Sequence, residues 1–306
     1  MILDIPTAAD FRESGLSFLN LAWAEAIDLL LGLTESDLVE YDSDGTIADE
    51  YWKRSQRSLS TAVTLAQQGA EFLIKERIAV VSPFLLFSGS ARDWPKGCER
   101  SDCSYAEFRT LDAQDLPRIH DTVAAVRLSA QFTGEFERLR KVRNSLVHTI
   151  SKNQRFGPAE VLRWVLRTYN EFCSPATWTS ARFDYLEEVS PGGVFPSEYT
   201  FRQRVARELR ATMDVLEPAE CKELLNIDKK QRFYFCLECH ISDFGFDNQP
   251  KTAQLQPNTP ESTEVRCQAC GTQAKVARSK CGECDGNVVL VDEDESQTCL
   301  SCGASA

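Results

Sequence analysis

The sequence predicts a mainly α-helical protein that ends in a small, cysteine-rich β domain. Apolar residues recur at three- and four-residue steps through most of residues 16–172, which is the period of amphipathic helices. From Arg232 the pattern changes to short β-like runs separated by turn residues and cysteine pairs. The 306 residues exceed the ~150 of a typical domain. We therefore expect a helical bundle at 1–175, a connector with an amphipathic helix at 176–230, and the β domain at 231–306.

Four helices are expected in the bundle, at about residues 16–32, 47–81, 117–150 and from 158 onward. Pro83 ends the second helix, and Val126 belongs to the apolar face of the third. Four helices with short or medium connections favour an antiparallel bundle. A further helix at about 198–216 lies in the connector.

The composition excludes several classes of protein. Hydrophobic residues make up 42% and charged residues 26%, which are ordinary globular values and exclude wholesale disorder and collagen. The longest apolar stretch, 16–33, contains Glu25 and Asp28, so we expect a buried core helix and no membrane contact. The first residues lack the basic and apolar regions of a secretory signal, which favours a cytoplasmic protein.

Four Cys-x-x-Cys knuckles predict metal binding. Two such knuckles complete a tetrahedral shell of four thiolates around one cation. The spacers between successive knuckles are 27, 10 and 14 residues, which favours pairing the first with the second and the third with the fourth. The alternative pairs the middle two knuckles and makes the outer two reach each other. The knuckles are Cys236/Cys239, Cys267/Cys270, Cys281/Cys284 and Cys299/Cys302.

We expect two structural Zn²⁺ ions and no catalytic metal. A closed thiolate shell leaves no open position for substrate, and a redox Cys-x-x-Cys motif would need a βαβ setting. Residues 232–306 resemble zinc ribbons, a resemblance that implies the fold and the metal. Residues 231–306 carry six basic and eleven acidic residues, so we expect these ribbons to recruit a protein partner. Cys98 and Cys103 find no matching knuckle and are expected to be loop thiols.

A second constellation ends the third helix. Asn144 and His148 are four residues apart and share one helical face, and Arg143 flanks them. The imidazole can transfer the proton of a ribose hydroxyl, and the guanidinium can hold the charge of a phosphodiester transition state.

The net charge of −12 means that RNA must be met by a local basic patch. Residues 138–167 hold eight Lys and Arg residues against Glu160 alone. The candidate RNA-binding residues are Arg138, Arg140, Lys141, Lys152 and Arg155.

The residues from Arg143 to His148 resemble the signature of the HEPN superfamily, an Arg, a polar residue, three residues and a His near the end of a long helix. The resemblance covers about 16–172 and includes residues 67–75 as the family's second helix. It implies an HEPN-like bundle and a metal-independent endoribonuclease, with Arg143, Asn144 and His148 as catalytic residues. It further implies a composite cleft across a homodimer, 2′,3′-cyclic phosphate products, and a bacterial toxin or anti-phage role.

Two alternatives remain open. In one, the bundle is a non-catalytic dimerisation module and the ribbons recruit a partner. In the other, the acidic tail covers the basic cleft and restrains cleavage. His120 is expected to be exposed at a helix start, and Glu71 and Lys75 to be solvated, with a smaller chance of lining the cleft.

Overall fold

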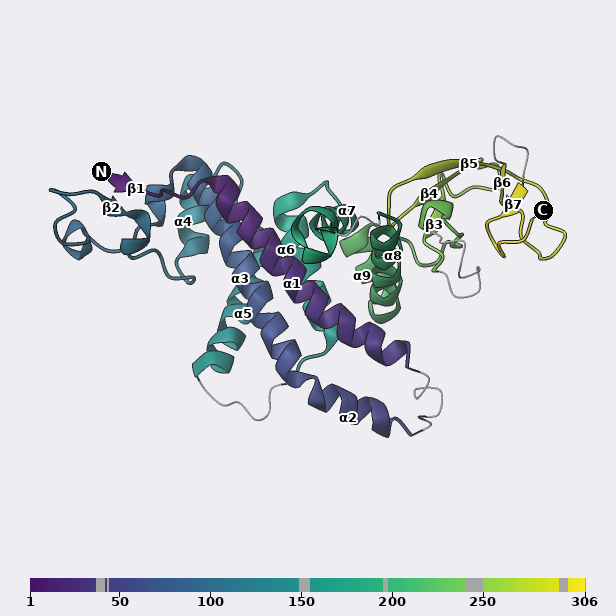
Figure 1. Cartoon of the computed structure of the whole chain (residues 1–306), viewed down its shortest axis with the longest axis horizontal. Coiled ribbons are helices and arrows are strands. Elements are labelled where there is room, and N and C mark those ends of the chain that lie inside the picture. Colours follow the sequence, from purple (N-terminus) through teal and green to yellow (C-terminus); the bar gives the residue numbers. More distant parts are fainter. Residues whose placement is uncertain are drawn as a thin grey trace. The chain divides into compact units, whose positions relative to one another are not determined.

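The computed structural model describes residues 1–36, 42, 44–148, 155–194, 198–239, 250–291 and 297–305. The chain divides into two compact units, Met1–Ser174 and Pro175–Ala306. Helices dominate the described residues, and a small antiparallel sheet occupies the C-terminal part (Figure 1). The prediction of a mainly helical chain with a C-terminal β domain is thus confirmed.

The first unit is built around α3, which contacts α1, α4, α5 and α6. Short 3-10 turns follow α3, and a two-residue parallel pair joins the N-terminus to the segment after them. The elements are β1 (Ile2–Leu3), α1 (Ala8–Thr34), α2 (Thr46–Arg54), α3 (Gln56–Val81), η2 (Pro83–Leu86), η3 (Ala91–Asp93), β2 (Cys103–Ser104), η4 (Tyr105–Glu107), α4 (Leu116–Val123), α5 (Ala130–His148) and α6 (Pro158–Cys173).

Helices α1 and α3 lie side by side at close range (Figure 1). Two glycines permit this approach, because a Cβ on Gly69 would lie 2.7 Å from Leu19 Cδ2 and one on Gly15 would lie 2.9 Å from Leu73 Cγ. Among the described helices, α1 is long and apolar enough to cross a membrane, with a mean hydropathy of 1.5. It packs its apolar face against α3 as a core helix, as expected for 16–33.

The expected helix at 47–81 is divided into α2 and α3. Ser55 lies between them with a ψ of −7°, and its hydroxyl donates to the Tyr51 carbonyl at 2.8 Å. Ser60 and Thr64 donate to the i−4 carbonyl in the same way within the unbroken α3, so this bond alone does not cause the break, and the apolar periodicity continues across Ser55. The sequence pattern alone therefore predicted one continuous helix.

The expected helix at 117–150 is also divided, because α4 ends at Val123 and α5 begins at Ala130. The Leu128 amide donates to the Asp121 carboxylate at 3.0 Å, and the Ser129 amide donates to Glu171 of α6 at 2.7 Å. These bonds hold the intervening turn outside a helical path. Val126 is consequently 79% exposed, and its assignment to an apolar face is wrong.

The second unit begins with helices and continues into the sheet. The expected helix at 198–216 is present as α8, whereas α7 and α9 were not expected from the sequence. The helical elements are α7 (Trp178–Asp184), the π-helical turn η5 (Tyr185–Val189), η6 (Pro191–Val194), α8 (Glu198–Val215), α9 (Pro218–Leu225) and η7 (Leu237–Cys239).

Five short strands form an antiparallel sheet in the order β3-β4-β5-β6-β7. β5 belongs to both halves, because residues 273–275 pair with β4 and residues 276–277 pair with β6. The two ribbons are therefore joined through one continuous strand. The strands are β3 (Ala253–Leu255), β4 (Glu264–Cys267), β5 (Gln273–Ala277), β6 (Val289–Val291) and β7 (Gln297–Cys299).

A buried ion pair fixes α7 against α8. Arg182 Nε and Nη2 each donate to the Glu208 carboxylate at 3.0 Å, and the side chains are 2% and 1% exposed. Arg204 Nε adds a bond to Glu208 Oε1 at 2.8 Å. Burial alone would raise the pKa of the Glu208 carboxyl, but the charges and hydrogen bonds of Arg182 and Arg204 lower it.

We expect Glu208→Gln to destabilise the second unit by ~3–5 kcal/mol, because it leaves the Arg182 charge buried and unpaired. Asp214→Asn is the matched control, since Asp214 pairs with Arg210 on the same helix but both are about half exposed. That control should change the free energy of unfolding by less than ~1 kcal/mol in urea denaturation of the zinc-loaded chain.

Because the pKa of Glu208 is lowered on folding, the contribution of its ion pair to the free energy of unfolding is present at neutral pH. It should be lost as the pH falls through the folded pKa, and equal losses in both variants would contradict this assignment.

Candidate functional site

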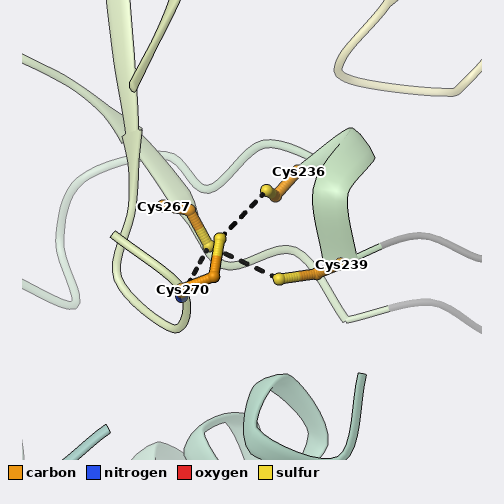
Figure 2. Close-up of side chains that lie close together, drawn as sticks. All are labelled: Cys236, Cys239, Cys267 and Cys270. Carbon is orange, nitrogen blue, oxygen red and sulfur yellow. Dashed lines mark hydrogen bonds between the residues drawn. The ribbon is translucent and has the colours of Figure 1, made fainter. Parts of the chain in front are cut away.

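Four cysteine sulfurs converge in the first ribbon (Figure 2). The Sγ atoms of Cys236 and Cys270 are 3.7 Å apart, and those of Cys239 and Cys267 are 3.8 Å apart. A tetrahedron with metal–sulfur bonds of ~2.3 Å has edges of about 3.8 Å. The four sulfurs therefore already have the separation that a tetrahedral thiolate shell requires.

The second ribbon repeats this arrangement. The Sγ atoms of Cys281 and Cys302 are 3.8 Å apart, as are those of Cys284 and Cys299. All four ligand atoms of each group lie within 4.8 Å of one another. The structure thus groups the knuckles in the order that their spacing favoured, first with second and third with fourth.

Turn geometry aims the sulfurs at a common point. The Cys270 amide donates to Cys267 Sγ at 3.5 Å, and the Gly286 amide donates to Cys284 Sγ at 3.2 Å. Gly271 and Gly303 follow the second cysteine of their knuckles and adopt φ values of 76° and 82°. These left-handed positions favour glycine and turn the chain away from the sulfurs.

The donor set fits zinc. Hydrogen bonds with its three neighbouring cysteines, together with burial, raise the pKa of Cys239, whereas hydrogen bonds from Cys236 and Cys239 lower the pKa of Cys270. Burial opposes ionisation of all four thiols. A divalent cation removes that penalty, since thiolates are its preferred soft ligands. Each group supplies four protein ligands and so completes the coordination of a structural zinc site. His240, the one histidine beside a knuckle, lies outside the described residues.

The end of α5 presents the second candidate site. Arg143 is half-buried, and its Nη1 donates to Asn144 Oδ1 at 3.1 Å. Arg143 Nε is buried without a hydrogen-bond partner. Among the described residues, Arg143 has no carboxylate partner. The backbone of His148 forms the last residue of α5, and its side chain lies outside the described residues.

Several of the candidate RNA-binding cations are paired with carboxylates. Arg140 donates two bonds to Glu137, at 2.7 and 3.0 Å, and these bonds lower the pKa of that carboxyl. Arg138 lies 3.9 Å from Glu160 and 5.2 Å from the ring centroid of Trp164. The local positive charge is therefore smaller than the count over residues 138–167 indicates.

The remaining candidates differ in their surroundings. Lys141 is 71% exposed and lies 3.7 Å from Glu137. Arg155 is exposed, and Lys152 lies outside the described residues. Arg167 of α6 pairs with Glu135. Glu135 and Glu137 just precede the basic segment, and the three-residue spacing from Glu137 to Arg140 is the signal that would have revealed the pairing.

Three other expectations about side chains are wrong. His120 is 3% exposed, and its Nδ1 lies 2.9 Å from Asp121 Oδ1. Glu71 and Lys75 form a 2.7 Å ion pair with side chains only 13% and 12% exposed. Gln67 extends this polar stripe along α3, donating to Glu71 at 3.3 Å. The packing of α4 and α5 against α3 accounts for the burial of these side chains, which were expected to be exposed to solvent.

We expect two Zn²⁺ ions per chain in metal analysis of the purified protein. Cys281→Ser removes a ligand from the second centre alone, so that variant should retain one ion. Chelation should unfold the sheet and leave the first unit folded, because metal binding of ~10–16 kcal/mol per site supplies folding energy. One ion or none in the reduced wild-type chain would contradict the two-centre assignment.

Gly286→Ala should weaken the binding of zinc at the second group of cysteines. A Cβ at this position would lie 2.6 Å from Ser301 Oγ, inside the fourth knuckle, and 3.0 Å from Cys284 Sγ, so Ser301 must shift and the Cys284 ligand is crowded. Gly282→Ala is the control, since no atom lies within 4 Å of a Cβ there. Metal content and competition with a chromophoric chelator measure both variants, and equal zinc affinity in the two would show that this packing does not matter.

Comparison with protein-family models, with curated proteins and with solved structures finds no match to this chain.

Proposed function

We propose that the chain is a metal-independent endoribonuclease of the HEPN type. The observation that carries the proposal is the guanidinium of Arg143, half-buried beside Asn144 and without a carboxylate partner among the described residues. Its cationic neighbours Arg138, Arg140 and Arg167 are each paired with a glutamate. A half-buried, uncompensated guanidinium favours an anionic ligand, and its planar fork suits a phosphodiester.

The proposed reaction uses the protein's own side chains. His148, one turn beyond Asn144, takes the proton from a ribose 2′-hydroxyl as that oxygen attacks the adjacent phosphorus. The bond between phosphorus and the 5′-oxygen of the next nucleotide breaks, that oxygen takes the proton held by His148, and the product ends in a 2′,3′-cyclic phosphate. Arg143 donates to the phosphoryl oxygens, where negative charge increases in the transition state. Asn144 holds the guanidinium through its side-chain oxygen.

The wider assignment follows the family resemblance. We propose that two chains form a homodimer in which both copies of the motif build one cleft, and that the protein acts in the cytoplasm as a toxin or anti-phage effector. The metal centres take no part in this chemistry, since each is a closed set of four cysteines in the second unit. If the chain does not cleave RNA, the alternative function is that of a non-catalytic adaptor that dimerises.

His148→Ala should reduce RNA cleavage by ~10²–10⁴-fold, the usual contribution of a general acid or base. Arg143→Lys should also cause a large loss, because it keeps the charge but removes the planar fork. Arg54→Lys makes the same change on α2, where Arg54 is 79% exposed and pairs with Glu50, and should leave the rate unchanged.

Cleavage is measured on single-stranded RNA with end-group analysis of the products, in EDTA during a short assay. Helicity by circular dichroism checks that each variant is folded. Activity of His148→Ala equal to that of the wild type, or no cleavage by the wild type, would overturn the proposal.

A further inference from the structure

A cavity of about 370 Å³ lies within the second unit, between the connector helices and the first metal centre. One wall comes from the start of α7 and from Phe183, and α8 contributes Arg202. The opposite wall is the second knuckle, Cys267–Gly271, preceded by Arg266. Neither the metal centres nor the proposed nuclease site uses this cavity.

The lining is cationic in an acidic protein. Arg202 and Arg266 line it, and none of its lining residues is an aspartate or glutamate. Arg266 is exposed and forms no ion pair with any described residue. Arg202 is 25% exposed, reaches the half-exposed Glu238 at 3.4 Å, and lies 5.8 Å from the Phe183 ring centroid. The cavity thus presents the Arg266 guanidinium, which has no carboxylate partner among the described residues, beside the paired guanidinium of Arg202 and an aromatic ring.

The walls of this cavity are held in place before any ligand arrives. The Thr179 hydroxyl donates to the Gln268 carbonyl at 3.2 Å and ties α7 to the knuckle. The buried pair of Arg182 and Glu208 fixes α7 against α8. Because Cys267 and Cys270 belong to the metal centre, zinc also orders the knuckle wall. A preorganised cavity spares a ligand the entropic cost of ordering its site.

Charge decides which class of ligand fits. Residues 231–306 carry a surplus of acidic residues, and a zinc tetrathiolate adds a formal charge of −2 beside the cavity. A polyanion such as RNA is repelled by that surrounding charge, whereas one carboxylate is held by short, forked hydrogen bonds. The ring of Phe183 favours an apolar neighbour next to that carboxylate.

We propose that this cavity binds an acidic side chain, with an adjacent apolar residue, on a protein partner. Arg266 binds the carboxylate, Arg202 adds a second donor beside its ion pair with Glu238, and Phe183 contacts the apolar neighbour. Because the site lies in the second unit, its test is independent of the proposed endoribonuclease activity.

The experiment uses the full, zinc-loaded chain and three fluorescent probes. The first is the peptide Gly-Phe-Glu-Gly-Phe-Gly, and the second is its amide isostere Gly-Phe-Gln-Gly-Phe-Gly. The third is octauridylate, measured in EDTA-free buffer with the His148→Ala variant so that the RNA is not cleaved. Anisotropy should show the acidic peptide binding roughly tenfold or more tightly than the isostere, which corresponds to one charge-assisted bond of about 1.4 kcal/mol.

Arg266→Gln and Arg202→Gln should each remove most of that preference with two zinc ions retained. Lys275→Gln is the control, since it removes one charge from the neighbouring strand β5 outside the cavity. Equal binding of the two peptides, or unchanged binding in both arginine variants, would overturn the proposal. Tighter and steeply salt-dependent binding of octauridylate, abolished by Arg266→Gln, would overturn it in favour of a nucleic-acid site.

Discussion

The meeting of four cysteine sulfurs at each of two points is the constraint on which the C-terminal sheet depends. Its strands are three to five residues long, and such short strands bury too little apolar surface to be stable alone. Cys267 and Cys299 are almost completely buried, together with a few apolar side chains such as Val265 and Val289. A metal ion bound at each group of four cysteines would add the folding energy that this small apolar core does not supply.

The two centres are also physically coupled. The Phe235 amide, just before the first knuckle, donates to the Leu300 carbonyl inside the fourth at 2.9 Å. Lys251 donates to the Ser301 carbonyl at 2.7 Å, and its ammonium lies 4.7 Å from the Phe235 ring centroid. With β5 shared between the halves, disorder in one ribbon removes strand pairing and hydrogen bonds from the other, while the other ribbon keeps its own four cysteines together. Sequence spacing described two modules in series, whereas the structure builds one sheet from both.

What the sequence could predict depends on the range of the interactions involved. Cysteine spacing is local and carries its own geometry, so the grouping of all eight ligands was predictable. The break after Val123 depends on hydrogen bonds to side chains, one of which reaches Glu171 on another helix. The burial of His120 likewise depends on tertiary packing. Periodicity reports which residues are apolar, but not where a tertiary contact interrupts a helix.

The charge of a segment shows the same limit, because a count of cations does not say which of them are paired with carboxylates. A count over residues 138–167 treats every cation as available, but the structure pairs Arg140 with Glu137 and Arg167 with Glu135. Those pairs remove general attraction for a polyanion, whereas Arg143, among the described residues, has a neutral amide as its side-chain partner. A site built in this way gains little from bulk electrostatics. Under the proposed function, recognition of a phosphate would come from the geometry of one half-buried guanidinium, which is the property that an arginine-to-lysine change removes.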